Sequence, residues 1–161
     1  MQHKNALLIE HFYKSFKNLD WRAMSDCYHQ DIHFSDPVFT ELRSHEVSGM
    51  WRMLCEKAKE FDLQYMNISA DDEYGSAQWI ATYRFGQADR QVRNVIYAEF
   101  QFQEGRIIRH SDHFSFWRWA ASALGVSGIL FGWSGLFKRK VQQKALAALR
   151  AYSKKSRETI S

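Results

Sequence analysis

The residues best suited to chemistry lie near the end of the last predicted strand. Residues 106–117 predict a strand whose alternation puts Ile108, His110, Asp112 and Phe114 on one face. Burying an imidazole and a carboxylate costs several kcal/mol unless they pair with each other or meet a polar ligand. The pair therefore indicates either an acid–base site or a satisfied His–Asp pair that only orients the sheet, and both interpretations stay open.

Asp36 is the second candidate for acid–base chemistry. It closes a predicted short strand over residues 32–37 and lies between Phe34 and Val38, just before the single proline, Pro37. An apolar setting destabilises an ionised carboxylate and raises its pKa, as a general base working near neutral pH requires. The alternative is a turn aspartate that binds local backbone amides.

Aromatic and amide side chains are expected to form the walls of a pocket around these groups. Aromatic residues make up 16% of the chain, which is high for a small core. The alternative is that these side chains are ordinary core. The predicted pocket residues are Tyr13, Trp51, Trp79, Tyr83, Asn94 and Phe114.

Helices are predicted first and strands afterwards, which is an α+β order. Leu8 to Leu19 has helical spacing, Asp20 can cap a second helix that includes Tyr28, and Ser44 can cap a third that runs to Ala58. We expect a cone-shaped, strongly curved antiparallel sheet with three N-terminal helices. The predicted meander strands cover residues 62–71, 76–86, 91–103 and 106–117, with a hairpin turn expected at Tyr74-Gly75-Ser76.

The C-terminal part of the chain has a different composition. Residues 120–137 are apolar with four glycines, and residues 138–152 predict a basic amphipathic helix. The segment from residue 138 onward carries +7 and the preceding residues carry −3. We predict a cone over 1–119 and an extension of the same domain over 120–161. We expect the apolar run to be a folded-back hairpin or lid over the cone mouth or a dimer interface, rather than a membrane-surface segment.

Composition narrows the classes of function. The mildly acidic body argues against nucleic-acid binding. The sequence shows no phosphate-binding glycine loop, dinucleotide fingerprint or metal-ligand cluster, so we expect no cofactor and no metal. Cys27 and Cys55 lie on apolar helical stripes and are expected to be buried thiols. The first 20 residues lack the apolar run of a signal peptide, so a cytoplasmic protein is expected.

Two runs resemble a known family. Residues 20–37, ending in Asp36-Pro37, and the terminal strand 105–114 are similar to the nuclear transport factor 2-like superfamily, in its ketosteroid isomerase and SnoaL-like polyketide cyclase branches. The resemblance covers about residues 5–117. It places Asp36 where the isomerases keep their general base, and Asp112 resembles the acid/base of the cyclases.

The resemblance also marks a departure from the isomerases. Phe12 and Ala98 occupy the places of their two acidic hydrogen-bond donors, and Tyr13 replaces the first donor only if the helix register shifts by one. Cofactor-free catalysis of the cyclase, isomerase or hydrolase type on a small hydrophobic substrate is one prediction. A non-catalytic ligand-binding module, or binding of a partner or membrane through the tail, is the alternative. A homodimer is expected from the family.

Overall fold

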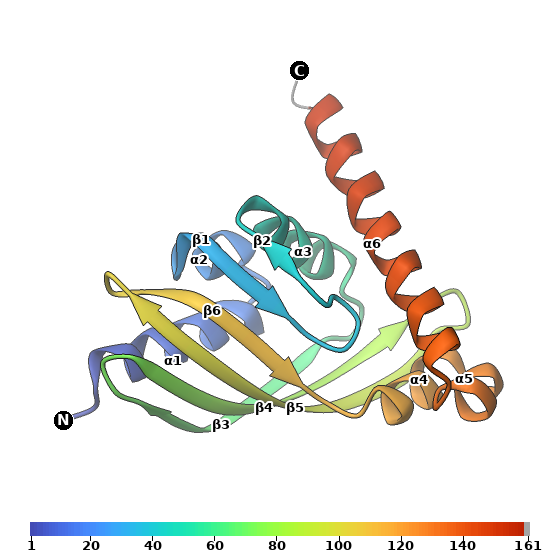
Figure 1. Ribbon diagram of the computed structural model, residues 1–161, viewed down its shortest axis with the longest axis horizontal. Coiled ribbons are helices and arrows are strands. Elements are labelled where there is room, and N and C mark those ends of the chain that lie inside the picture. The colour runs from blue at the N-terminus through green and yellow to red at the C-terminus, as the bar shows by residue number, and fades with distance from the viewer. Residues whose placement is uncertain (160–161) are drawn as a thin grey trace.

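Three helices at the start of the chain cover one face of the sheet in the computed structural model, which describes residues 1–159 (Figure 1). They are α1 (Lys4–Lys17), α2 (Trp21–Asp26) and α3 (His45–Lys57). The predicted cap of α2 is present, since the Asp20 carboxylate accepts from the Ala23 amide at 3.1 Å. Ser44 precedes α3 as predicted, but its side chain makes no capping bond because its backbone is left-handed, with φ +50°.

Six strands form one sheet in the order β2-β1-β6-β5-β4-β3. The expectation of a purely antiparallel sheet is wrong at one place, because β1 pairs with β6 in parallel. The four strands β3 to β6 form the predicted antiparallel meander, and the parallel step joins its last strand to β1. The strands are β1 (Tyr28–Ser35), β2 (Leu42–Arg43), β3 (Asp62–Ala70), β4 (Tyr74–Phe85), β5 (Arg90–Gln103) and β6 (Arg106–His113).

The turn predicted at Tyr74-Gly75-Ser76 lies three residues earlier in the structure, between the end of β3 at Ala70 and the start of β4 at Tyr74. The turn is made by Asp71, whose carboxylate accepts from the amides of Glu73 at 2.8 Å and Tyr74 at 2.7 Å. Gly75 already belongs to β4, where a side chain would meet Ile9 at 2.8 Å. This glycine therefore marks a close approach of α1 to the sheet rather than a turn.

The last strand is shorter than predicted. β6 ends at His113 instead of Trp117, and Ser115 caps a helix by accepting from the Arg118 amide at 3.4 Å. An irregularity in the pairing of β5 with β6 also changes the alternation, so Ile107 is buried while Ile108 is only partly covered. Beyond this irregularity, His110 and Asp112 face the helices as predicted.

The main core lies between the sheet and the helices, where the five largest of the fully buried side chains are aromatic. Cys27 and Cys55 are free, buried thiols, as the sequence predicts. Burial raises the pKa of each thiol to about 12, so both stay protonated and behave as small apolar groups.

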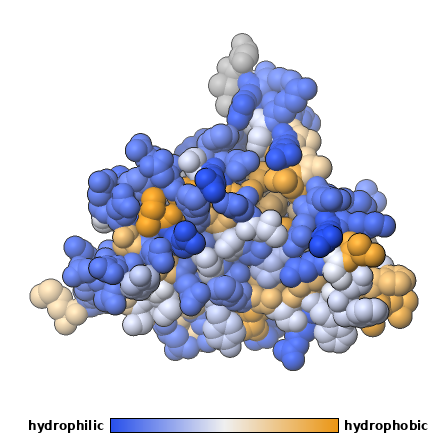
Figure 2. All heavy atoms as spheres, in the orientation of Figure 1, coloured by the Kyte–Doolittle hydropathy of each residue, from blue (hydrophilic) through white to orange (hydrophobic). Residues whose placement is uncertain are grey.

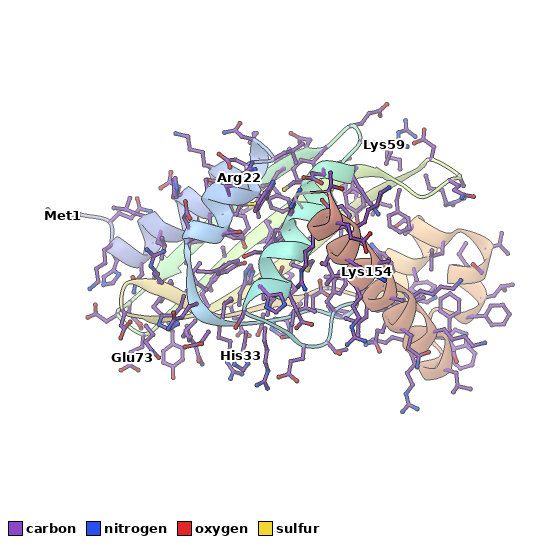
Figure 3. All side chains as sticks on the ribbon, turned by 90° about the horizontal axis from the view of Figure 1, so that it is seen from above. Met1, Arg22, His33, Lys59, Glu73 and Lys154 are labelled. Carbon is purple, nitrogen blue, oxygen red and sulfur yellow. The ribbon has the colours of Figure 1, made fainter. Side chains whose placement is uncertain are left out.

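The C-terminal extension consists of α4 (Phe116–Leu124), α5 (Val126–Phe131) and α6 (Gly135–Glu158). α4 and α5 fold back on each other at Gly125, and the predicted boundary between residues 119 and 120 falls inside α4. A second apolar cluster joins α4 to the sheet through Val92 and Trp119. α6 then crosses α3, with Leu149 in the main core (Figure 3). No helix within residues 1–159 is both long and apolar enough to span a bilayer.

Candidate active site

His110 is completely buried at the centre of the helix-covered face of β6. Its Nδ1 lies 2.8 Å from the Tyr28 hydroxyl and its Nε2 lies 3.0 Å from Asp112 Oδ1. Trp51 stacks on the imidazole with ring centroids 6.1 Å apart, and Phe100 packs on it at 4.5 Å. Because both nitrogens are paired and rings cover the imidazole, His110 holds its neighbours in place rather than meeting a ligand.

The direction of each hydrogen bond in this network follows from donor and acceptor counts. The indole of Trp51 can only donate, and it donates to the Tyr28 oxygen at 2.9 Å. A carboxylate can only accept, so a neutral imidazole carries its proton on Nε2 and donates it to Asp112. Nδ1 is then the acceptor, and Tyr28 donates its own hydrogen to it. Burial, with Asp112 nearby, raises the pKa of Tyr28 well above its ordinary value, so the phenol keeps this donor role.

Asp112 is almost fully buried, at 3% exposure, and is held from two sides. Its Oδ1 accepts from His110 Nε2 and from the indole N–H of Trp79, the latter at 3.3 Å. Both bonds go to the same oxygen, Oδ1. The residue in register on β5 is Ala98, which adds little bulk beside the carboxylate.

Asp36 comes to the neighbourhood of Asp112 because β1 and β6 run in parallel. Phe34 pairs with His110, so two residues further along the two strands lead to Asp36 and Asp112. Burial is the main cause of the raised pKa of Asp36, and the charge of Asp112 adds to it. The sheet thus brings together two acids that are distant in the sequence.

The Asp36 carboxyl is half-buried and makes the local turn that the sequence left open as an alternative. Its Oδ1 accepts from the amides of Val38 and Phe39, each at 2.6 Å. Burial nevertheless raises its pKa to about 7, while these two bonds act in the opposite direction. Asp36 is therefore both a turn residue and a group that can change its protonation near neutral pH.

Tyr13 contributes the one buried side-chain polar atom within residues 1–159 that has no hydrogen-bond partner. The hydroxyl comes from α1, where Phe12 and Tyr13 are both fully buried. Burial, followed by the charge of Asp112, raises the pKa of Tyr13 well above its ordinary value. The group is a neutral hydroxyl that lacks an acceptor.

The remaining predicted pocket residues lie toward the end of the sheet covered by α4. Tyr83 is half-buried and accepts from the indole N–H of Trp119 at 3.1 Å. Asn94 is buried on β5, and Phe114 packs against both apolar clusters. Burial raises the pKa of Tyr83, and the charge of Asp36 adds to the effect, so this end of the sheet is electrostatically linked to the acids.

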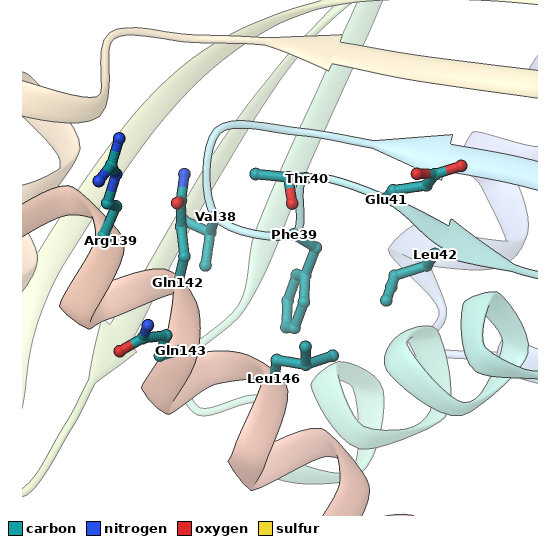
Figure 4. Close-up of a pocket in the computed structure, with 9 residues that line it drawn as sticks. All are labelled: Val38, Phe39, Thr40, Glu41, Leu42, Arg139, Gln142, Gln143 and Leu146. Carbon is teal, nitrogen blue, oxygen red and sulfur yellow. The ribbon is translucent and has the colours of Figure 1, made fainter. Parts of the chain in front are cut away.

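Two cavities are evident at the surface, and none of the predicted site residues lines either of them. The first, of about 210 Å³, lies between α6 and the loop after β1 (Figure 4). Its wall includes Val38 and Phe39, whose amides bind Asp36, so this cleft adjoins the carboxyl. No cluster of three or more metal-ligating side chains occurs within the described part of the chain.

Two contributors were missed from the sequence. Tyr28 has helical spacing from Met24 and was assigned to the second helix, yet it begins β1 and binds His110. The second is Trp119, for which the sequence predicts no role, although its indole donates to Tyr83. The signal that could have found it is Ser115, a cap residue directly before α4, the helix that carries Trp119.

Similarity to solved structures shows a nuclear transport factor 2-like fold. An LEH-like epoxide hydrolase from M. tuberculosis aligns with a TM-score of 0.64 and 17% identity, over 79% of this chain and 95% of that chain. A hypothetical protein with a ketosteroid isomerase-like fold from Catenulispora acidiphila, in complex with trimethylamine, aligns with a TM-score of 0.63 and 9% identity. The alignment covers 72% of this chain and 91% of that chain. A proposed polyketide cyclase from Xanthomonas campestris pv. campestris aligns with a TM-score of 0.62 and 16% identity, over 74% of this chain and 96% of that chain.

The sequence itself adds a family assignment. No curated protein matches the chain. The family model of the SnoaL-like domain matches residues 9–110, which is more than half of the chain and includes Asp36 and His110. This confirms the resemblance predicted from the Asp36-Pro37 run and the terminal strand. The chain belongs to the SnoaL-like domain family.

Proposed function

We propose that this protein catalyses cofactor-free proton transfer on a small hydrophobic substrate that carries a carbonyl group. Asp36 takes the proton, and the Tyr13 hydroxyl donates a hydrogen bond to the oxygen on which negative charge develops. The observation that carries the proposal is the buried Tyr13 hydroxyl, which has no partner and is electrostatically coupled to Asp112. A donor without an acceptor at this place is what an oxyanion site requires in the absence of substrate.

The two acids have unequal roles in this reaction. Two carboxylates close together in an apolar interior are not both ionised easily, and hydrogen bonds decide which keeps its charge. Asp112 accepts two N–H donors on Oδ1, which fix its position beside the core rings. Asp36, with a pKa of about 7, is the acid that can accept and return a proton near neutral pH. His110 is a positioning residue that fixes Asp112.

The cleft beside α6 is the proposed route of entry to Asp36. Its wall is formed in part by Val38 and Phe39, and Gln142 of α6 closes one side by donating to the Pro37 carbonyl at 3.0 Å. A volume of about 210 Å³ is below the roughly 300–1,000 Å³ of pockets for drug-sized ligands, which favours a small substrate.

The test is exchange of the α-protons of a small ketone. The probe is 2-tetralone in D₂O, followed by proton NMR with and without the protein. We expect protein-dependent exchange that falls roughly 10- to 100-fold in Tyr13→Phe, because the donor to the enolate oxygen is lost. Tyr65→Phe is the matched control. The ring of Tyr65 stacks on that of Tyr13 with centroids 5.8 Å apart, so this variant loses a hydroxyl from the neighbouring ring instead.

Retention of the full exchange rate in Tyr13→Phe would show that this hydroxyl has no part in the reaction. Tight binding of the ketone without exchange in the parent protein would instead favour a module that only holds a ligand.

The pair of acids also gives the binding module a specific candidate ligand. Two carboxyl groups and the rings of Trp79 and Tyr83 would suit a small organic cation, through charge and cation–π attraction. The Catenulispora acidiphila protein is in complex with trimethylamine. Under this alternative, trimethylammonium chloride raises the melting temperature of the protein more than the same concentration of sodium chloride, and Asp36→Asn removes the difference.

A further inference from the structure

One face of α5 exposes large apolar side chains to solvent. Val126, Ile129 and Leu130 on α5 are each at least half exposed, and Trp133, in the turn directly after the helix, is 77% exposed. Figure 2 shows hydrophobic residues gathered at the edge of the molecule where α5 lies. Leu136 at the start of α6, 73% exposed, extends the same surface. We call these five side chains the α5 face. These five side chains therefore do not pack against the rest of their own chain.

The α5 face is held outward by the packing on the opposite side of the helix. Gly128 is buried against α4, where an added side chain would lie 1.9 Å from the Ala120 carbonyl oxygen. The indole of Trp117 also donates to the Ile129 carbonyl at 3.3 Å. Close contact of this kind between two helix backbones is possible only through a residue as small as glycine. The hairpin thus presents its apolar side chains from a fixed support.

Positive charge surrounds the α5 face. Residues 113–157 contain nine lysines and arginines and no aspartate or glutamate. Three of these cations, Lys138, Arg139 and Lys140, directly follow the apolar side chains, and Lys138 lies over the Phe116 ring at 5.5 Å. The cations continue along α6 to Lys154, labelled in Figure 3.

Charge decides between the possible occupants of this surface. A symmetric dimer formed through the α5 face would bring two strongly cationic extensions together, because the same patch is used on both copies. An anionic membrane surface is complementary to both the α5 face and the cations of α6. Its headgroups attract the cations, and its interface accepts apolar and tryptophan side chains. We propose that the α5 face and the adjacent cations of α6 bind the surface of membranes that contain anionic phospholipids.

The test is sedimentation of the full chain with vesicles of phosphatidylcholine, with or without about 30% phosphatidylglycerol. At about 50 mM salt we expect binding to the anionic vesicles that is at least 10-fold stronger than to the neutral ones, and that is lost at about 500 mM salt. Leu130→Glu should weaken it at least 10-fold. Leu7→Glu is the matched control, because Leu7 on α1 is 50% exposed and Leu130 is 55% exposed.

A second readout reports the depth of binding. The fluorescence of Trp133 should shift to shorter wavelength with anionic vesicles, and Trp133→Phe should remove most of the shift while circular dichroism stays unchanged. Equal binding of Leu130→Glu and Leu7→Glu would overturn the proposal. So would a dimer in light scattering that Leu130→Glu converts to monomer, since the α5 face would then bind a second copy.

Discussion

His110→Leu should lower the free energy of unfolding by about 3 kcal/mol or more, because it leaves several buried polar groups without partners. The Tyr28 hydroxyl loses its acceptor and Asp112 loses one of its two donors, in a place where neither side chain reaches bulk water. For a chain of this size, such a loss corresponds to a fall of roughly 10 °C in melting temperature. Urea unfolding at neutral pH measures the effect directly.

His113→Leu is the matched control for this substitution. His113 lies on the same strand and meets Glu99 at 2.8 Å, but its side chain is 60% exposed. An exposed pair of this kind contributes about 1 kcal/mol or less. Similar losses in the two variants would contradict the structural importance assigned to the buried network.

Asp36→Asn should abolish about 99% or more of the exchange activity, since general base catalysis is worth roughly 10²–10⁴-fold and the amide cannot take a proton. The fold should survive, because the asparagine oxygen can still accept from the amides of Val38 and Phe39. In the parent protein the exchange rate should rise with pH through about 7, as Asp36 ionises. Exchange in Asp36→Asn at a tenth or more of the parent rate would exclude Asp36 as the base.

The same substitution should change the pH dependence of stability. The folded-state pKa of Asp36 is about 7, above the unfolded value near 3.9, so the unfolded state releases this proton first as pH rises. The contribution of Asp36 to the free energy of unfolding therefore falls as the pH rises from about 4 to about 7. Because the group is half-buried and screened, we expect Asp36→Asn to be about 1–2 kcal/mol more stable than the parent at pH 8 and equal to it near pH 4. Asp31→Asn, an exposed change on the strand that leads to Asp36, should show no such crossover.

Much of the fold is predictable from the sequence because the helical and alternating patterns of apolar residues extend over many residues. The apolar stripe from Val47 onward predicts α3, and the alternation of Asn94, Ile96 and Ala98 predicts the inward face of β5. The errors occur where one local contact overrides the pattern. The turn at Asp71 and the irregularity that buries Ile107 are such places.

The candidate site is only partly predictable for a related reason. His110 and Asp112 are two residues apart on one strand, so their shared face can be read directly. The approach of Asp36 depends on parallel pairing between strands about 75 residues apart, which only the assembled sheet provides. The orphan hydroxyl of Tyr13 also cannot be foreseen, because a missing partner is a property of the packed interior.

The measurement that tests the account most directly is a pH titration of the aspartate carboxyl carbons by carbon-13 NMR. We expect the carboxyl signal of one aspartate to titrate near pH 7 and to be absent in Asp36→Asn. In Asp112→Asn its titration midpoint should move to lower pH, because a neighbouring negative charge is removed. This expectation would be contradicted if every aspartate titrated below about pH 5, or if the signal of Asp36 were unchanged when Asp112 is replaced.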